Sequence, residues 1–198
     1  VDHRIEPAYS SYRLLEADSC ALSTYQMQGP FEVIARLGVN KHTKRPSEDD
    51  HKAAYLNALM WTLTGDEAHA RKSIEILNAY SAMLKLIGPN DNDDPLCASL
   101  QGSMLANAAE LIKHTYSKVT PAEIAGWEKM LRTVFIPVLD TFFKAKPYTN
   151  GNWGAAATKA YMAFGIFLED EALYNQAVHF YYNGHDNGTI KNYIGENG

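Results

Sequence analysis

The chain has 198 residues, of which 46% are hydrophobic, and a net charge of −5 with both signs scattered along the sequence. A chain of this length supports one substantial core, so we expect residues 1–198 to form a single domain. The lack of a basic tract argues against nucleic acid as a partner, and no apolar run approaches the roughly 20 residues that a membrane-spanning helix needs.

The N-terminal residues from Val1 to Arg4 are polar, which is not the pattern of an uncleaved signal peptide, so we expect a mature protein. Cys20 and Cys97 leave two alternatives open, one disulfide or two separate buried thiols. Their spacing does not match a zinc-binding pattern.

Apolar residues at spacings of three and four predict a helix from Lys52 onward, which Gly65-Asp66 ends. Its predicted inner positions are Leu56, Leu59, Met60 and Leu63. A second helix is predicted from about Glu67 to Ile87, ended by Gly88-Pro89. Its predicted inner stripe is Ala70, Ile74, Leu77, Ser81 and Leu84.

A third helix is predicted around residues 100–111, and a fourth begins at Thr120-Pro121-Ala122-Glu123. There Thr120 caps the helix, Pro121 suits its first position, and Glu123 reaches back to the cap amide. Pro137 lies inside this long fourth helix and removes one backbone hydrogen bond, which predicts a kink. The inner stripes of the two helices are predicted as Leu100, Met104, Ala108 and Leu111, and as Ile124, Trp127, Leu131, Val134, Val138 and Phe142.

A loop is predicted over residues 146–153, followed by a helix of small residues from near Gly154 and a last helix through about Tyr182. Glu169-Asp170 separates these two helices. No segment shows strand alternation, so we predict an all-α fold of consecutive antiparallel hairpins. Because the hairpins are unequal and no fixed period recurs, an incomplete (α/α) toroid is favoured over a regular solenoid.

The segment from Tyr148 to Gly154 is rich in amides and glycine. The side chains of Asn150 and Asn152 suit a carboxylate or a sugar hydroxyl, and Trp153 offers a flat face to a sugar ring. The alternative is that both asparagines serve turn and capping chemistry while Trp153 fills the core.

Five segments, in order along almost the whole chain, resemble the alginate-lyase-like polysaccharide lyases of helical toroid fold. The resembling segments are Gln26-Met27-Gln28-Gly29-Pro30; Thr64-Gly65-Asp66 with Ile76-Leu77-Asn78-Ala79-Tyr80; Leu100-Gln101-Gly102 with Asn107-Ala108-Ala109-Glu110-Leu111; Asn150-Gly151-Asn152-Trp153; and Tyr182-Asn183-Gly184 with Asn187-Gly188-Thr189-Ile190. The resemblance implies a secreted enzyme, extracellular or periplasmic, that cleaves alginate or glucuronan by β-elimination without a cofactor.

In these lyases an asparagine neutralises the uronate carboxylate, a tyrosine or histidine takes the C5 proton, and a tyrosine protonates the leaving oxygen. Carried onto this chain, the resemblance implies Asn152 as the neutraliser, with Asn150 as second choice, and Trp153 near the sugar. It further implies catalytic roles for His185 and Tyr193. Asn187 and Gln101 are its remaining substrate-binding candidates.

The chain departs from the resembling family at its end, because relatives continue beyond the position of Gly198 into a polar cluster that supplies part of the active site. We therefore expect a C-terminally incomplete toroid. Three alternatives stay open: a piece of a longer enzyme, a genuine truncation, or a site that a further chain or segment completes. A broken ring exposes an apolar face and favours association.

The remaining polar clusters predict no metal site. The acidic run around Asp91, Asp93 and Asp94 lacks the glycine and distant glutamate of a calcium loop, and the histidines show no metal-ligand spacing. A basic patch of Lys41, His42, Lys44 and Arg45 would attract an anionic polysaccharide, the expected partner. The rival hypothesis is a non-catalytic helical module that binds carbohydrate or protein, or an inactive fragment of a lyase.

Overall fold

Helices make up nearly all of the regular structure in the computed structural model, which describes residues 4–88, 93–144, 151–184, 189–190 and 194. The prediction of an all-α fold is confirmed. Within the described residues, no helix is both long and apolar enough to cross a membrane. The helices are α1 (Ala8–Glu16), α2 (Lys44–Thr64), α3 (Glu67–Met83), α4 (Asp94–Thr115), α5 (Pro121–Met130), α6 (Ile136–Lys144), α7 (Gly151–Phe167) and α8 (Glu171–Asn183).

Five short elements complete the described structure. Two are single 3-10 turns, η1 (Ser19–Ala21) and η2 (Lys41–Thr43), and η3 (Leu131–Phe135) is a π-helical turn between α5 and α6. The strands β1 (Val33–Ile34) and β2 (Leu86–Ile87) pair in parallel. Cys20 and Cys97 are both buried and are not joined by a disulfide.

The hairpin of α2 and α3 turns at Gly65, which has a φ of +72°, a conformation that glycine adopts without strain. The side chain of Asp66 then caps α3 by accepting a hydrogen bond from the amide of Ala68. The predicted inner stripes were partly wrong, since Leu63 is exposed and Ala53, Ala54 and Ala58 of α2 are buried instead. In α3 the buried positions are Ala70, Ser73, Ile76, Leu77 and Tyr80.

Two boundaries of this hairpin differ from the prediction. Helix α2 begins at Lys44 rather than near Lys52, because its first turns bury the polar side chains of Ser47, Asp50 and His51. Helix α3 ends at Met83 rather than at Ile87, because the next residues leave the helix to pair with β1. This pairing brings the segments that precede α2 and α4 together, so both helices start at the same end of the molecule.

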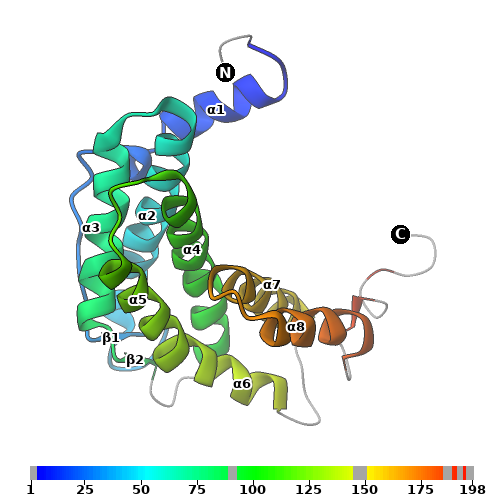
Figure 1. Ribbon diagram of the computed structural model, residues 1–198. Coiled ribbons are helices and arrows are strands. Elements are labelled where there is room, and N and C mark those ends of the chain that lie inside the picture. Colours follow the sequence, from blue (N-terminus) through cyan, green and yellow to red (C-terminus); the bar gives the residue numbers. More distant parts are fainter. Residues whose placement is uncertain (1–3, 89–92, 145–150, 185–188, 191–193, 195–198) are drawn as a thin grey trace.

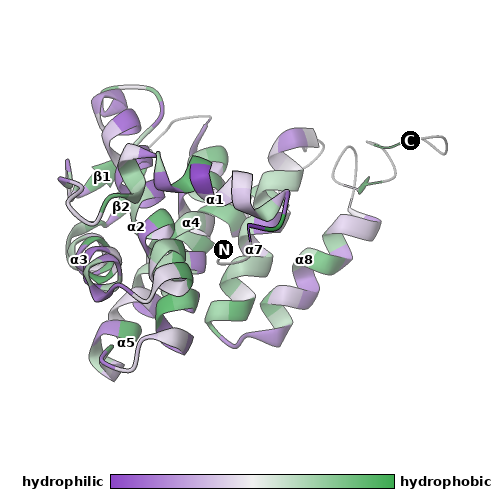
Figure 2. Ribbon diagram, turned by 90° about the horizontal axis from the view of Figure 1, so that it is seen from above, coloured by the Kyte–Doolittle hydropathy of each residue, from purple (hydrophilic) through white to green (hydrophobic). Residues whose placement is uncertain are grey.

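Helix α4 lies at the centre of the fold, between α2 and α7 (Figures 1 and 2). Its buried surface consists mostly of small residues, which allow neighbouring helices to approach closely. The clearest case is Gly102, where an added Cβ would lie 2.7 Å from ring atoms of both Phe135 and Phe164. The predicted stripe of Leu100, Met104 and Leu111 is only half-buried.

The predicted capping box at the start of α5 is confirmed, with Thr120 and Glu123 each bonding the backbone amide of the other. The predicted kink at Pro137 takes the form of the π-turn η3, which lies just before the proline. There the amide of Ile136 bonds the carbonyl of Leu131, five residues back. The predicted inner residues Trp127, Leu131, Val134 and Phe142 are buried.

The hairpin of α7 and α8 forms the other side of the molecule from α3, and Figure 2 shows the order α3, α2, α4, α7 and α8 across the fold. Gly165 permits its tight packing, because a Cβ there would lie 2.8 Å from the backbone of Tyr174. In Figure 1 these helices form an open row of hairpins. Closure into a toroid stays a prediction.

Candidate active site at the start of α7

The sequence had predicted that Asn152 and Trp153 lie in a loop. Both instead lie in the first turn of α7. The side chain of Asn152 is exposed, whereas Trp153 is half-buried and packs against the core. Gly154 is buried behind them. The tryptophan therefore fixes the first turn to the rest of the fold while the asparagine amide faces solvent.

The start of α7 has no acidic residue in its first turn, a feature that it shares with α1, α2 and α6. The first amides of a helix have no intrahelical acceptor and carry partial positive charge. At five of the other helices, acidic side chains from the protein itself cap or neutralise these amides: Glu6 at α1, Asp66 at α3, Asp94 at α4, Glu123 at α5 and Asp170 at α8. At α7 the sequence of residues 144–150 adds two lysines and no acid. This helix start is thus suited to an external anion.

The core beneath α7 is aromatic and holds one buried phenol. Tyr161 donates a hydrogen bond to Asp140 of α6, and its ring packs edge-on against Phe143. Burial, followed by the hydrogen bond to Asp140 and by its charge, raises the pKa of Tyr161 above its ordinary value. A phenol that stays protonated and has no exposed surface holds α6 against α7 and is not placed to take a proton from a substrate.

Gln101 has no exposed surface, so its side chain does not reach the solvent from which a polysaccharide would approach. Its Nε2 lies 3.3 Å from the Sγ of Cys97, and its Oε1 is buried without a hydrogen-bond partner in the described structure. The structure therefore does not bring Gln101 together with Asn152 and Trp153 at the surface.

The histidine nearest to Gln101 is also internal. Both ring nitrogens of His51 are buried and make no hydrogen bond within the described residues, and its ring lies 4.3 Å from that of Tyr80. Burial lowers the pKa of His51 to about 3. The side-chain oxygen of Gln101 partly opposes this shift, because it is close enough to favour a protonated ring although the geometry is not that of a hydrogen bond. His51 is consequently a neutral core residue and has no access to a substrate.

The end of α8 lies toward the start of α7, because the two helices form one antiparallel hairpin. With 17 residues in α7 and 13 in α8, the last turn of α8 falls roughly 6 Å short of the level where α7 begins, at 1.5 Å per residue. Thr189 bonds back to this end of α8, with its Oγ1 2.9 Å from the carbonyl of Tyr182.

Four of the predicted site residues lie outside the described residues, namely Asn150, His185, Asn187 and Tyr193. The structure does describe residues that neighbour these four in the sequence. Gly151 begins α7, and Gly184 and Thr189 lie at the end of α8. Their roles stay predictions.

The structure contains a buried carboxylate that the sequence did not predict. Asp50 is fully buried and accepts hydrogen bonds from the hydroxyls of Tyr25 and Tyr80 and from the amides of Gln28 and Gly29, at distances between 2.7 and 2.8 Å. The sequence signal was weak, because Asp50 belongs to a run of charged residues that is typical of a solvated face. Its four donors attach the extended segment before β1 to α2 and α3.

The acidic and basic clusters noted in the sequence do not form a metal centre within the described residues, where no group of three potential ligands occurs. Asp93 instead pairs with Arg36, which also bonds Glu48 at 2.6 Å and so links the starts of α2 and α4. Lys41 and His42 are exposed in η2 beside the start of α2, while Arg45 pairs with Asp49.

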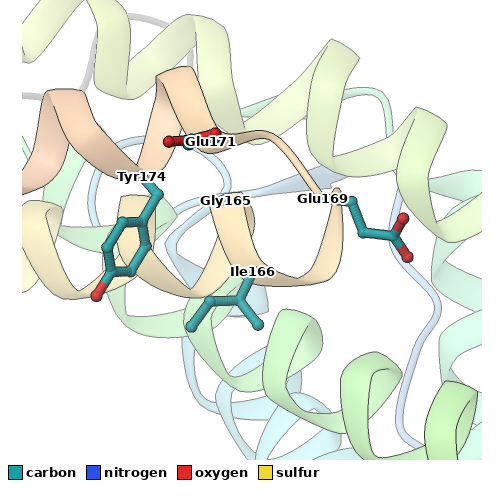
Figure 3. Close-up of a pocket in the computed structure, with 5 residues that line it drawn as sticks. All are labelled: Gly165, Ile166, Glu169, Glu171 and Tyr174. Atoms are coloured by element: carbon teal, nitrogen blue, oxygen red, sulfur yellow. The ribbon is translucent and has the colours of Figure 1, made fainter.

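A shallow hollow of about 380 Å³ lies at the far end of the α7 and α8 hairpin from Asn152 (Figure 3). Ile166 and Tyr174 form its mostly apolar surface, and Glu169 and Glu171 lie at its edge. Glu169 is paired with Lys113 at 2.6 Å. Two carboxylates beside the hollow disfavour an anionic sugar there, so the start of α7 is the better candidate for uronate chemistry.

The sequence of residues 30–194 matches the family model described as alginate lyase. The match covers α2 to α8 and includes the start of α7. Neither the curated proteins nor the solved structures include a significant match.

Proposed function

Because the chain belongs to the alginate lyase family, we propose that it is a polysaccharide lyase that cleaves a uronic-acid chain by β-elimination at the start of α7. The observation that carries the proposal is the exposed Asn152 amide, placed within the family match on a helix start that has no acidic residue of its own.

β-Elimination requires removal of the C5 proton of a uronate. That proton is poorly acidic while the adjacent carboxylate keeps its full charge, because its loss builds a second negative charge beside the first. A hydrogen-bond donor on the carboxylate lowers this cost, and it lowers it most in the transition state, where the charge is greatest. The lyase therefore needs a fixed donor at the carboxylate.

Asn152 supplies such a donor from its side-chain amide, and the backbone amides of the first turn, which have no acceptor within the helix, add partial positive charge at the same place. Trp153 keeps this turn in position through its core packing. Its remaining exposed surface offers a stacking face to the sugar ring. Asn150 is the second donor candidate, from the residue before α7.

The base and the acid are assigned to the segment that follows α8. His185 and Tyr193 are the two candidates, and the C5 proton passes to one while the other protonates the leaving glycosidic oxygen. Support comes from the hairpin, which directs the end of α8 back toward Asn152. Asn187 is proposed as a further sugar ligand from this segment. No cofactor enters this scheme.

The substrate class is an anionic polyuronate, with alginate and glucuronan as the two candidates. Lys159 supports an anionic chain, because it is exposed on α7 seven residues beyond Asn152, about 10 Å along the helix axis. It lies on the same face of the helix and can meet the carboxylate of another unit. Such polymers lie outside the cell, so we propose an extracellular or periplasmic location.

The test is to incubate the protein separately with polymannuronate, polyguluronate and glucuronan, and to follow the ultraviolet absorbance of the unsaturated uronate. The proposal expects one polymer to yield products that carry a C4–C5 double bond, together with a fall in polymer mass. Binding of a polymer without any unsaturated product would support a non-catalytic binding module instead.

A further inference from the structure

A cavity of about 300 Å³ lies between the end of α3 and the π-turn η3 and shares no residue with α7. Ser81, Ala82, Leu84 and Lys85 line it on one side, and Lys129, Met130, Thr133 and Val134 line it on the other. Because these residues come from two separate helical segments, the cavity is part of the tertiary structure and not the surface of one helix.

The π-turn shapes one wall of this cavity. The amide of Ile136 bonds the carbonyl of Leu131 across five residues, so the turn is wider than a normal helical turn. Pro137 follows directly and lacks the amide that would restore the regular pattern. Thr133 lies in this widened turn, and Lys129 lies just before it, in the last turn of α5. Such turns occur frequently at functional sites.

The polar groups of the cavity are matched to a sugar acid. The hydroxyl of Ser81 donates to the carbonyl of Asn78, and that of Thr133 donates to the carbonyl of Lys129, so both present lone pairs as acceptors. Two ammonium groups supply the donors. Lys85 pairs with Glu32 at 2.9 Å, and no described acidic residue pairs with Lys129.

The ion pair between Lys85 and Glu32 does not close the cavity to an anion. Both side chains are more than half exposed, and a pair of this kind contributes little to stability in water. The last carbonyls of α3 add a partial negative charge of roughly half a unit near the cavity. Glu32 balances the charge of Lys85, so Lys129 is the cation that leaves the cavity positive.

The apolar part of the cavity consists of Leu84, Met130 and Val134, which are all buried. Such a floor suits the C–H face of a sugar ring, and a volume of about 300 Å³ lies at the lower limit for ligand pockets. The space therefore fits one sugar unit and not an oligosaccharide.

We propose that this cavity is a second, non-catalytic binding site for one hexuronate unit. Its carboxylate lies on the ammonium groups of Lys129 and Lys85, and its hydroxyls donate to Ser81 and Thr133. The choice of a uronate over another small anion rests on the proposed function. The unit is either a free monosaccharide or the end of a polymer chain, and the two share this chemistry.

The test is calorimetric titration of the Asn152→Ala protein, in which turnover at α7 is strongly lowered, with glucuronate, with glucose and with a glucuronan oligomer. Glucuronate should bind at least about tenfold more tightly than glucose, because only the acid forms the charged hydrogen bonds. Lys129→Ala should weaken glucuronate binding by about tenfold, and Lys85→Ala should weaken it less.

Lys118→Ala is the matched control, since it removes the same charge from an exposed lysine that pairs with Glu67 away from the cavity. Equal binding of glucose and glucuronate, or equal effects of Lys129→Ala and Lys118→Ala, would overturn the proposal. Tighter binding of the oligomer than of the monomer would identify a polymer end as the ligand, provided that Lys129→Ala removes the difference. Since the titration needs no turnover, Lys129-dependent binding of glucuronate together with no cleavage of any polymer by the wild type would refute the proposed function alone.

Discussion

The hydroxyl of Tyr80 donates a hydrogen bond of 2.7 Å to the carboxylate of Asp50, which has no exposed surface. The same carboxylate accepts from Tyr25 and from two backbone amides before β1. Burial, followed by the charge of Asp50, raises the pKa of Tyr80. A buried charge is tolerated here because four donors replace the water that it loses.

Replacement of Asp50 by Asn is expected to destabilise the protein strongly. The amide group keeps the shape of the carboxylate but turns one acceptor oxygen into a donor that faces other donors. The expected loss in the free energy of unfolding is about 3 kcal/mol, measured by urea denaturation. Asp49→Asn is the control, since it breaks the exposed pair with Arg45 and should cost less than about 1 kcal/mol. Equal losses in the two variants would contradict this role of Asp50.

The stability of the protein is expected to fall in mild acid because of His51. Its folded pKa is lowered to about 3 from an ordinary 6.5, so the unfolded chain binds a proton that the folded chain does not. Stability is therefore full above pH 6.5 and is lost as the pH falls from 6.5 toward about 3. At pH 4.5 the expected loss from this group is about 2 kcal/mol relative to pH 7.

The measurement is the free energy of unfolding at both pH values for the wild type, His51→Gln and His42→Gln. His51→Gln should lose most of this pH dependence, although a remainder from His69 persists, because burial lowers its pKa as well. His42→Gln removes an exposed histidine and should leave the dependence intact. An unchanged pH dependence in His51→Gln would refute the assignment.

Two glycines in helices are expected to respond to alanine with opposite signs. At Gly102 the new methyl group would lie 2.7 Å from two phenylalanine rings, and overpacking of this kind costs about 1–3 kcal/mol. At Gly126 the nearest atom is the Oγ of Ser81 at 3.6 Å, so alanine should add up to about 1 kcal/mol through its helix propensity. Thermal or urea unfolding of both variants checks this difference, and equal shifts would contradict the close packing of α4.

The sequence predicted those elements whose boundaries depend on local chemistry. Thr120 and Glu123 form the expected capping box, and Gly65 ends α2 as expected. Most of the stripe through Trp127 and Phe142 was also predicted correctly, because large apolar residues occupy it, although Ile124 and Val138 are only partly buried. In these places the local signal and the tertiary environment agree.

The sequence failed where polar or small residues face the core. The first turns of α2 were missed because Asp50 and His51 occupy its inner face, and their burial depends on partners far along the chain. The buried faces of α2 and α4 differ from the predicted inner stripes, because close helix contacts bury alanine and glycine in preference to leucine. Asn152 was placed in a loop because glycine and asparagine favour turns, whereas α7 includes it.

Trp153 is expected to contribute both to stability and to substrate binding. Trp153→Ala removes its core packing, which should cost about 2 kcal/mol for a half-buried ring. It should also raise the KM for the polymer several-fold, and Trp153→Phe should recover part of both effects because a flat ring remains. Trp61→Ala is the control, because Trp61 packs on Tyr116 between α2 and α4. It should lower stability without a change in KM. Similar KM values for Trp153→Ala and wild type would assign Trp153 to packing alone.

The most direct test of the central claim is the rate of unsaturated-uronate formation by the wild type, Asn152→Ala and Asn152→Asp. Loss of the donor in Asn152→Ala should lower kcat/KM by about 10²- to 10³-fold. Asn152→Asp should abolish turnover through repulsion of the uronate carboxylate, yet it should stabilise the fold by about 0.3–1 kcal/mol, because a negative charge at the start of a helix is favourable. Lower activity with equal or higher stability in Asn152→Asp would place the uronate carboxylate at the start of α7. Turnover by Asn152→Ala at the wild-type rate would contradict that placement.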